Sequence, residues 1–162
     1  ISFLDKMLCG LEEIWNFEVV HRDITPGNIM MKPDGSPVII DFGIARYLDK
    51  TSLTGTYLAQ GPCTPPFAPP EVLTNNKEQI DCRSDLFSLG IVVYIMTTGI
   101  HPIWDNSKSA KENRMNMIEK QIPSLKDHLG EIGRFIDRMV QKEPYKRFRN
   151  PTMARKILDK YK

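Results

Sequence analysis

The sequence predicts a mainly α-helical fold with a small β-hairpin region near its amino-terminal end. Three features support this prediction: helical spacing of apolar residues over 1–16, two short apolar runs around a turn at 33–35, and a helix at 84–98 that is apolar on every side. The 162 residues suit one domain, and a composition of 41% apolar and 26% charged residues is that of an ordinary globular protein.

The first expected element is an amphipathic helix, and β-prone residues follow it. Apolar residues at 1, 3, 4, 7, 8, 11, 14 and 15 fall on one helical face. "EVV" at 18–20 is β-prone, and two apolar runs in "NIMMKPDGSPVIID" flank Pro33-Asp34-Gly35. Pro presets φ, Asp bonds its own backbone and Gly accepts positive φ, so this tripeptide predicts a hairpin that leaves Asp41 at a strand exit.

The rest of the chain predicts a long loop and four helices. Residues 44–70 are rich in Thr, Gly and Pro, and a loop of that length in a compact domain is usually functional. We expect Ser84 or Asp85 to cap the buried helix and Gly99 to end it. Further helices are expected over 109–120, over 125–140, and over 151–160 after the cap Asn150. The second of these has an apolar stripe of Leu125, Leu129, Ile132, Ile136 and Val140.

Composition excludes several classes of protein. A net charge of +2 is too small to indicate nucleic acid or a membrane surface as a partner. Cys9, Cys63 and Cys82 are isolated, so they predict neither zinc nor a disulfide framework and favour a reduced, cytoplasmic location. The apolar run at 89–96 is too short to span a bilayer, and no signal peptide is visible. The chain begins in mid-pattern without Met, so we expect it to be part of a longer protein.

A series of polar motifs indicates phosphate chemistry. "HRD" stands at 21–23, Asn28 follows its Asp by five positions, and "DFG" stands at 41–43. Mg²⁺ prefers the hard oxygen ligands that Asn28 and Asp41 offer. A carboxylate such as Asp23 accepts a hydrogen bond from a hydroxyl without competing as a donor. Three further features follow in the chain: "PPE" at 69–71, Asp85 and Arg147.

In order and spacing, these motifs resemble the eukaryotic-like (Hanks-type) protein kinase family. The resemblance covers essentially residues 1–162, as the C-terminal (large) lobe of a kinase domain, with a catalytic loop at 21–28 and an activation segment at 41–71. It implies that Asp23 orients the acceptor hydroxyl and takes its proton, and that Asn28 and Asp41 hold Mg²⁺ (or Mn²⁺) against the phosphates of ATP. Gly43 lets the chain turn after Asp41.

The resemblance also implies roles for packed side chains. His21 and Phe42 would stack in a spine between two lobes, and Met30, Val92 and Met96 would form a second spine that the adenine ring completes. The alternative for each of them is plain core packing. Asp85 would anchor the backbone of the HRD loop, although its position also suits a simple helix cap.

Other implied roles concern the activation segment. Glu71 and Arg147 would form a buried bidentate pair, where the alternative is two surface charges. Arg22 would receive a phosphorylated loop residue. Thr64 matches a threonine near the substrate-docking loop and indicates a Ser/Thr acceptor. The candidates for the phosphorylated residue are Thr51, Ser52, Thr54, Thr56 and Tyr57.

Three departures from the family pattern limit the expected activity. Thr25 stands where Ser/Thr kinases usually carry a γ-phosphate-binding Lys, and a hydroxyl cannot replace a cation. Pro69 replaces the usual Ala before Pro70, which an extended conformation tolerates. The glycine-rich loop, the lysine-bearing strand and the glutamate helix of the small lobe are missing. We therefore expect this polypeptide to be inactive alone, and to need an N-terminal lobe in cis or in trans to phosphorylate a protein substrate.

Two other functions remain as alternatives. The absent lobe and Thr25 are compatible with a non-catalytic, pseudokinase-like interaction lobe. "TPGNIM" at 25–30 resembles small-molecule kinases of the aminoglycoside or choline type, although these usually replace the HRD arginine with Gly and lack the "DFG" and "PPE" features. The short loops and the "DFGIAR" run are bacterial in style.

Overall fold

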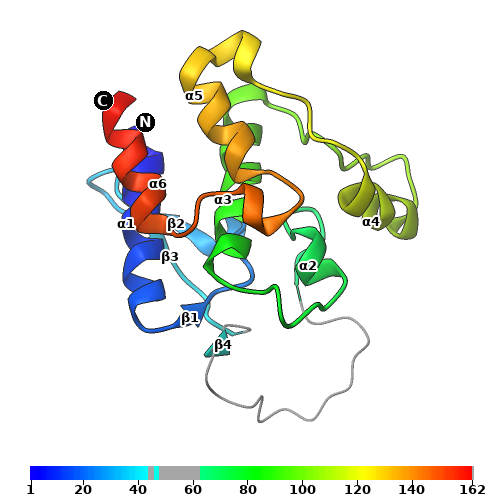
Figure 1. The fold of residues 1–162 in the computed structure, drawn as a ribbon, viewed down its shortest axis with the longest axis horizontal. Helices are drawn as coiled ribbons and strands as arrows, with labels where there is room; N and C mark the ends of the chain where they lie inside the picture. The colour runs from blue at the N-terminus through cyan, green and yellow to red at the C-terminus, as the bar shows by residue number, and fades with distance from the viewer. Residues whose placement is uncertain (44–45, 48–62, 162) are drawn as a thin grey trace.

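The computed structural model describes residues 1–43, 46–47 and 63–161, which form a helical body with two short antiparallel ribbons (Figure 1). This confirms the mainly helical prediction. The elements are α1 (Ser2–Asn16), β1 (Val19–Val20), β2 (Ile29–Met31), β3 (Pro37–Ile39), β4 (Arg46–Tyr47), α2 (Pro70–Leu73), α3 (Cys82–Thr98), α4 (Ala110–Glu119), α5 (Lys126–Met139) and α6 (Pro151–Leu158). Short 3₁₀ turns cover Pro26–Asn28, Pro144–Lys146 and Asp159–Tyr161.

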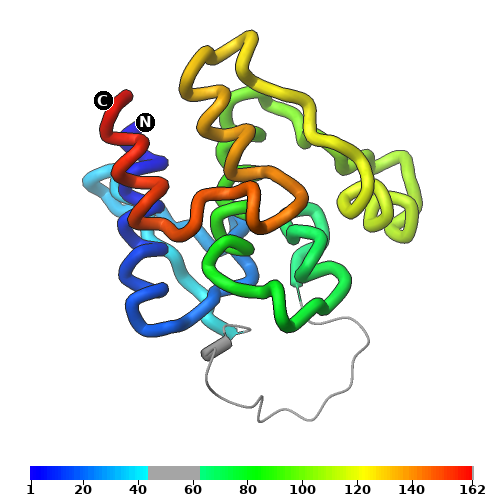
Figure 2. Tube along the Cα trace, viewed as in Figure 1, coloured from blue at the N-terminus to red at the C-terminus, as the bar shows by residue number. Residues whose placement is uncertain are grey.

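Helix α3 is the centre of the molecule, with α1 and α5 packed against it. Every residue from Ser84 to Tyr94 is buried, as expected for a helix apolar on all sides. Helix α6 lies along α1, so the two ends of the chain are neighbours (Figure 2). Among the residues that the structure describes, no helix is both long enough and apolar enough to cross a membrane.

The predicted hairpin forms with the expected turn. Strands β2 and β3 pair antiparallel, with Ile29 opposite Ile39. Gly35 has a φ of 75°, and the Asp34 carboxylate accepts a hydrogen bond of 2.8 Å from the Ser36 N–H. The turn therefore uses the positive φ and the Asp side chain that the sequence indicates.

Several boundaries differ from the prediction. The cap of α3 is Asp81, whose side chain accepts a hydrogen bond from the Arg83 N–H, so the predicted caps Ser84 and Asp85 are wrong. Strand β4 lies within the segment predicted as a loop and pairs with β1. A strand of two residues is too short to show a period in the sequence.

Helix α5 departs from its predicted stripe. Gly130 has a φ of 56° and kinks the helix. The first turn is therefore out of register with the rest, and Leu129 is 38% exposed where burial was expected. Leu125, Ile136 and Val140 are buried as predicted. The caps of the other late helices form: Ser109 and Glu112 make a capping box for α4, and Asn150 accepts from the Met153 N–H at α6.

The contact between α3 and α5 predicts that Gly90→Ala lowers the free energy of unfolding by about 1–3 kcal/mol, although Ala is the better helix former. The added Cβ would lie 2.7 Å from the Val140 Cγ1 and 2.9 Å from the Met139 Cβ. Gly10→Ala in α1 is the matched control, because its nearest atom would be the Ile39 Cδ1 at 3.6 Å. That control should gain roughly 0.5–1 kcal/mol. Urea unfolding measures both, and shifts in the same direction would contradict this packing.

Candidate active site

The HRD loop is held by the carboxylate of Asp85, one turn into α3. The Asp85 Oδ2 accepts from the His21 N–H at 2.9 Å, and its Oδ1 accepts from the Arg22 N–H at 2.8 Å. Arg22 has a φ of 70°, a conformation that costs a non-glycine residue roughly 1–3 kcal/mol. The hydrogen bonds from two successive backbone N–H groups to a buried carboxylate offset this cost, because leaving that buried acceptor unsatisfied would be destabilising.

The burial of Asp85 also changes its acidity. Removal from water raises the pKa of Asp85 to about 7, while the bonds from the His21 and Arg22 N–H groups act in the opposite direction. The carboxyl group therefore carries a proton at low pH and gives it up close to neutrality. Two donors are in place to bind the ionised form as it appears.

The side chains of Asp23 and Asn28 are in direct contact. The Asn28 Nδ2 donates to the Asp23 carbonyl at 2.8 Å and to the Asp23 Oδ2 at 2.9 Å. This orientation fixes the amide, so that its Oδ1 is the atom available to a cation. The other carboxylate oxygen of Asp23 accepts from the Thr64 N–H at 3.0 Å, which brings Thr64 beside Asp23.

Asp41 follows Ile40, the residue after β3, which is hydrogen-bonded to this loop. The Ile40 N–H donates to the Asn28 carbonyl at 3.0 Å, and the Ile40 carbonyl lies 3.2 Å from the His21 Nε2. Asp41 itself has a φ of 61°, and its Oδ1 accepts from the Gly43 N–H at 3.0 Å. A Cβ at position 43 would also lie 3.0 Å from that oxygen, so glycine suits the turn.

The His21 ring lies beside this loop, and burial lowers its pKa. The hydrogen bond to the Ile40 carbonyl is the largest influence that opposes this change, followed by the charges of Asp23 and Asp41. In the described ranges no group of three or more His, Cys, Asp or Glu side chains is arranged for a metal ion. Amide and carboxylate oxygens, such as those of Asn28 and Asp41, are ligand types that Mg²⁺ accepts, and this ion keeps several waters and takes few protein ligands.

Packing around the site is looser than expected for core residues. His21 is fully buried and touches Phe42 edge to face, with 4.8 Å between the ring centroids. Phe42 is nevertheless 48% exposed, Met30 52% and Met96 59%, so the alternative of plain core packing does not describe these three side chains. Met30 is on an uncovered face of the hairpin, and Met96 lies in the last turn of α3, beyond the core. Val92 is buried as expected.

Glu71 and Arg147 form the predicted bidentate pair, at 2.6 and 3.0 Å, and both are buried. Arg147 also donates to the carbonyls of Gln141, Arg83 and Lys142. Ser84, expected as a cap, instead donates to the Glu71 carboxylate at 2.8 Å. No local pattern distinguishes these two uses of a serine near a helix start.

Two predicted features of the loop can be placed only in part. Thr25 is 7% exposed, so its hydroxyl is packed near the start of the 3₁₀ turn rather than reaching outward. The Arg22 backbone is held by Asp85 as described above. The five candidate phosphorylation sites at 51–57, and most of the activation segment, lie outside the described residues.

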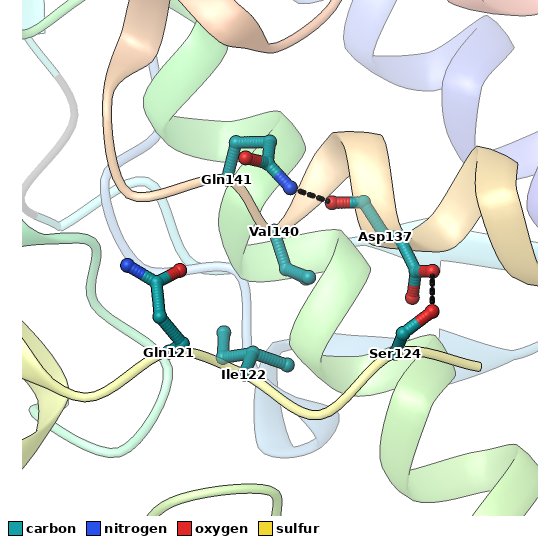
Figure 3. A pocket seen from close by; sticks show the side chains of 6 residues that line it. All are labelled: Gln121, Ile122, Ser124, Asp137, Val140 and Gln141. Atoms are coloured by element: carbon teal, nitrogen blue, oxygen red, sulfur yellow. Dashed lines mark hydrogen bonds between the residues drawn. The ribbon is translucent and has the colours of Figure 1, made fainter. Parts of the chain in front are cut away.

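Two pockets in the described part of the chain are lined by other residues. One of about 240 Å³ is bordered by the segment 121–124 and the end of α5 (Figure 3). The Asp137 carboxylate there accepts from the Ser124 hydroxyl and the Leu125 N–H, and its carbonyl accepts from the Gln141 amide. Asp137 therefore serves as an anchor for the segment before α5. A second pocket, of about 320 Å³, is lined by residues that include Glu71, Lys142 and Tyr145.

Comparisons with known proteins agree with the motifs. The family described as "Protein kinase domain" matches residues 1–160. A probable serine/threonine-protein kinase, ireA of Dictyostelium discoideum, is 35% identical over 144 residues, which are 88% of this chain and 14% of that protein. A probable serine/threonine-protein kinase, PknB of Bifidobacterium longum, is 42% identical over 64% of this chain and 15% of its own length.

A third relative is the serine/threonine-protein kinase PknA of Corynebacterium glutamicum. It is 32% identical over 150 residues, which are 91% of this chain and 30% of that protein. The chain therefore spans less than a third of the length of each of these three relatives.

The buried pair predicts a large cost for removing one partner. Glu71→Ala should lower the free energy of unfolding by about 3–5 kcal/mol, because Arg147 would stay buried with its charge uncompensated. The matched control is Glu131→Ala, whose partner Arg134 lies 2.7 Å away at the surface and whose side chain is 57% exposed. That loss should be below about 1 kcal/mol. Denaturant unfolding compares them, and equal losses would count against a desolvated pair.

The raised pKa of Asp85 predicts a pH-dependent stability. A carboxyl group whose folded-state pKa rises from 3.8 to about 7 adds stability that is present below about pH 4 and lost as the pH rises to about 7. The unfolding free energy of the wild type minus that of Asp85→Asn should therefore fall across this window, while contributions of other groups such as His21 cancel. Urea unfolding from pH 4 to pH 8 measures it, and a difference that grows with pH would mean that Asp85 stays ionised throughout.

Proposed function

Because the chain belongs to the protein kinase domain family, we propose that residues 1–162 are the C-terminal catalytic lobe of an ATP- and Mg²⁺-dependent kinase that phosphorylates serine or threonine of proteins. The observation that carries the proposal is the double hydrogen bond from the Asn28 amide to Asp23. It joins a candidate proton acceptor to a candidate metal ligand in one rigid unit. The three relatives described above are named serine/threonine-protein kinases, which supports the acceptor class.

In this proposal the side chains divide the work. Asp23 accepts a hydrogen bond from the substrate hydroxyl and takes its proton as the new bond to phosphorus forms. The Asn28 Oδ1 and the Asp41 carboxylate would hold the divalent cation. Bound ATP would supply its γ-phosphoryl group as the bond to the β–γ bridging oxygen breaks and ADP leaves, and Mg²⁺ would neutralise charge on the phosphates. Thr64, bonded through its N–H to Asp23, stands where the substrate chain passes.

The proposal extends to the parts that hold the site in place. Asp85 keeps the HRD loop in its strained form, and the Glu71–Arg147 pair secures the end of the activation segment against the late helices. Met30 would contact the adenine ring, and Arg22 would pair with a phosphate on the activation segment. A small lobe supplied in cis or in trans would complete the nucleotide site, and we expect residues 1–162 alone to be inactive.

The kinase proposal predicts that Asp41→Asn in the complete protein lowers kcat by about 100-fold or more, since a charge that holds the metal is lost. Asp34→Asn, in the exposed hairpin turn, is the matched control and should leave kcat within about twofold.

Asp23→Asn should reduce kcat far more than nucleotide affinity. Transfer of labelled phosphate to a serine peptide and nucleotide binding provide the two readouts. Unchanged turnover in Asp41→Asn would contradict the metal role.

Thr25 favours a second candidate, a non-catalytic interaction lobe, because the usual cation at this position is absent. Nucleotide binding by the complete protein without transfer to any protein would support that candidate. Labelled phosphate on a small hydroxylated compound, and on no protein, would instead support a small-molecule kinase.

A further inference from the structure

We propose that His101 is a positioning residue for protein substrates, because its ring ties the turn at 64–67 to the loop between α3 and α4. The inference rests on the proposed kinase function and adds a residue that none of the motifs contains. The two joined segments are 35 residues apart in the sequence.

The turn at 64–67 stands directly against Asp23. Its first residue, Thr64, donates its N–H to the Asp23 carboxylate at 3.0 Å, and the turn is closed by the Phe67 N–H on the Thr64 carbonyl at 3.0 Å. A chain that presents a hydroxyl to Asp23 must therefore run past this turn. A displacement of the turn would weaken the surface that the substrate chain contacts, and a loss of such binding raises the Michaelis constant for the peptide while kcat stays unchanged.

The turn has few backbone donors of its own. Pro65 and Pro66 carry no N–H, and the carbonyls of Thr64 and Pro65 are used by Phe67 and Ala68. The Pro66 carbonyl receives its hydrogen bond from outside, with the His101 Nε2 at 2.7 Å. The Phe67 ring also meets the His101 ring edge to face, with 6.2 Å between centroids.

The other ring nitrogen determines the form of His101. Its Nδ1 lies 3.1 Å from the Ile103 nitrogen and 2.7 Å from the Trp104 nitrogen, and both of these groups are N–H donors. Nδ1 must therefore be the unprotonated acceptor, which places the single proton on Nε2, where it is donated to the Pro66 carbonyl. One neutral imidazole thus caps its own loop and tethers the neighbouring turn.

The surroundings of the ring maintain this neutral form. Burial and the charge of Lys142, which follows α5, both lower the pKa of His101, while the bond to Pro66 opposes them. Around the tether, the half-buried side chains of Phe67, Ile103 and Trp104 pack on the same apolar cluster. The packing brings the segments together, and the hydrogen bond defines the direction of the Pro66 carbonyl.

Two substitutions separate the bonds of the ring. In His101→Asn the side-chain oxygen can replace Nδ1, so the cap on Ile103 and Trp104 stays while the tether is lost. In His101→Gln the amide nitrogen can reach the Pro66 carbonyl, so the tether stays while the cap is lost. A purely structural histidine would be affected similarly by both changes.

The test uses the complete protein that includes this chain, in wild-type, Asn and Gln forms. Hydrogen exchange of fragments covering 63–68 and 102–105 reports the tether and the cap without needing catalysis. Kinetics with a serine peptide report the Michaelis constants for peptide and for ATP. We expect the His101→Asn variant to exchange faster than wild type only at 63–68. Its peptide KM should rise about tenfold, while its kcat and its KM for ATP stay within about twofold of wild type. The His101→Gln variant should exchange faster only at 102–105 and keep the wild-type peptide KM.

Each contrary result counts against a defined part of the inference. Unchanged exchange at 63–68 in the Asn variant would overturn the tether, whatever the activity. Faster exchange there with an unchanged peptide KM, or an equal rise in both variants, would overturn the positioning role. If the wild-type protein binds nucleotide but transfers no phosphate, the proposed kinase function itself is contradicted. The exchange measurement would still decide whether His101 holds the turn.

Discussion

The carboxylate of Asp85, buried in α3 and bonded to two successive backbone N–H groups, is the interaction on which the candidate site depends. It holds Arg22 in a left-handed conformation that an L-residue avoids, between a fully buried His21 and a half-buried Asp23. Without a buried acceptor at this point, the loop would lose both bonds at once and relax to an ordinary conformation.

Helix α3 is a platform for irregular segments as well as a core helix. In its first turns, the Ser84 hydroxyl donates to Glu71, and the Asp85 carboxylate accepts from the HRD loop. The Arg83 carbonyl in the same turns accepts from Arg147. The charges involved are costly to bury, and each is satisfied by several partners, which is the condition under which a buried ion pair is tolerated. The apolar faces of the same helix meanwhile pack on α1 and α5. Irregular backbone near the site is thus hydrogen-bonded to the buried central helix.

The polar side chains of the site are held by hydrogen bonds within this chain, whereas the apolar side chains near it are partly exposed. Asp23, Asn28 and Thr64 are linked by short hydrogen bonds, whereas Met30, Phe42 and Met96 remain about half exposed. Phosphate chemistry needs preorganised oxygens, and the hydrogen bonds provide them within this chain. The exposed apolar groups are surfaces that a further lobe and an adenine ring would cover in the proposed enzyme.

The sequence by itself determined the helical class, the hairpin turn at 33–35 and the identity of the chemical groups, because helical periodicity, turn residues and motifs are local properties. It also indicated the partners of Asp85 and of Glu71 through the family resemblance, although their roles remain proposals. Only the tertiary structure decided that Asp81 caps α3, that Gly130 turns Leu129 outward, and that His101 reaches Pro66. The first two are choices among local backbone conformations that the same residue types allow, and a hydrogen bond between segments 35 residues apart leaves no periodic trace in the chain.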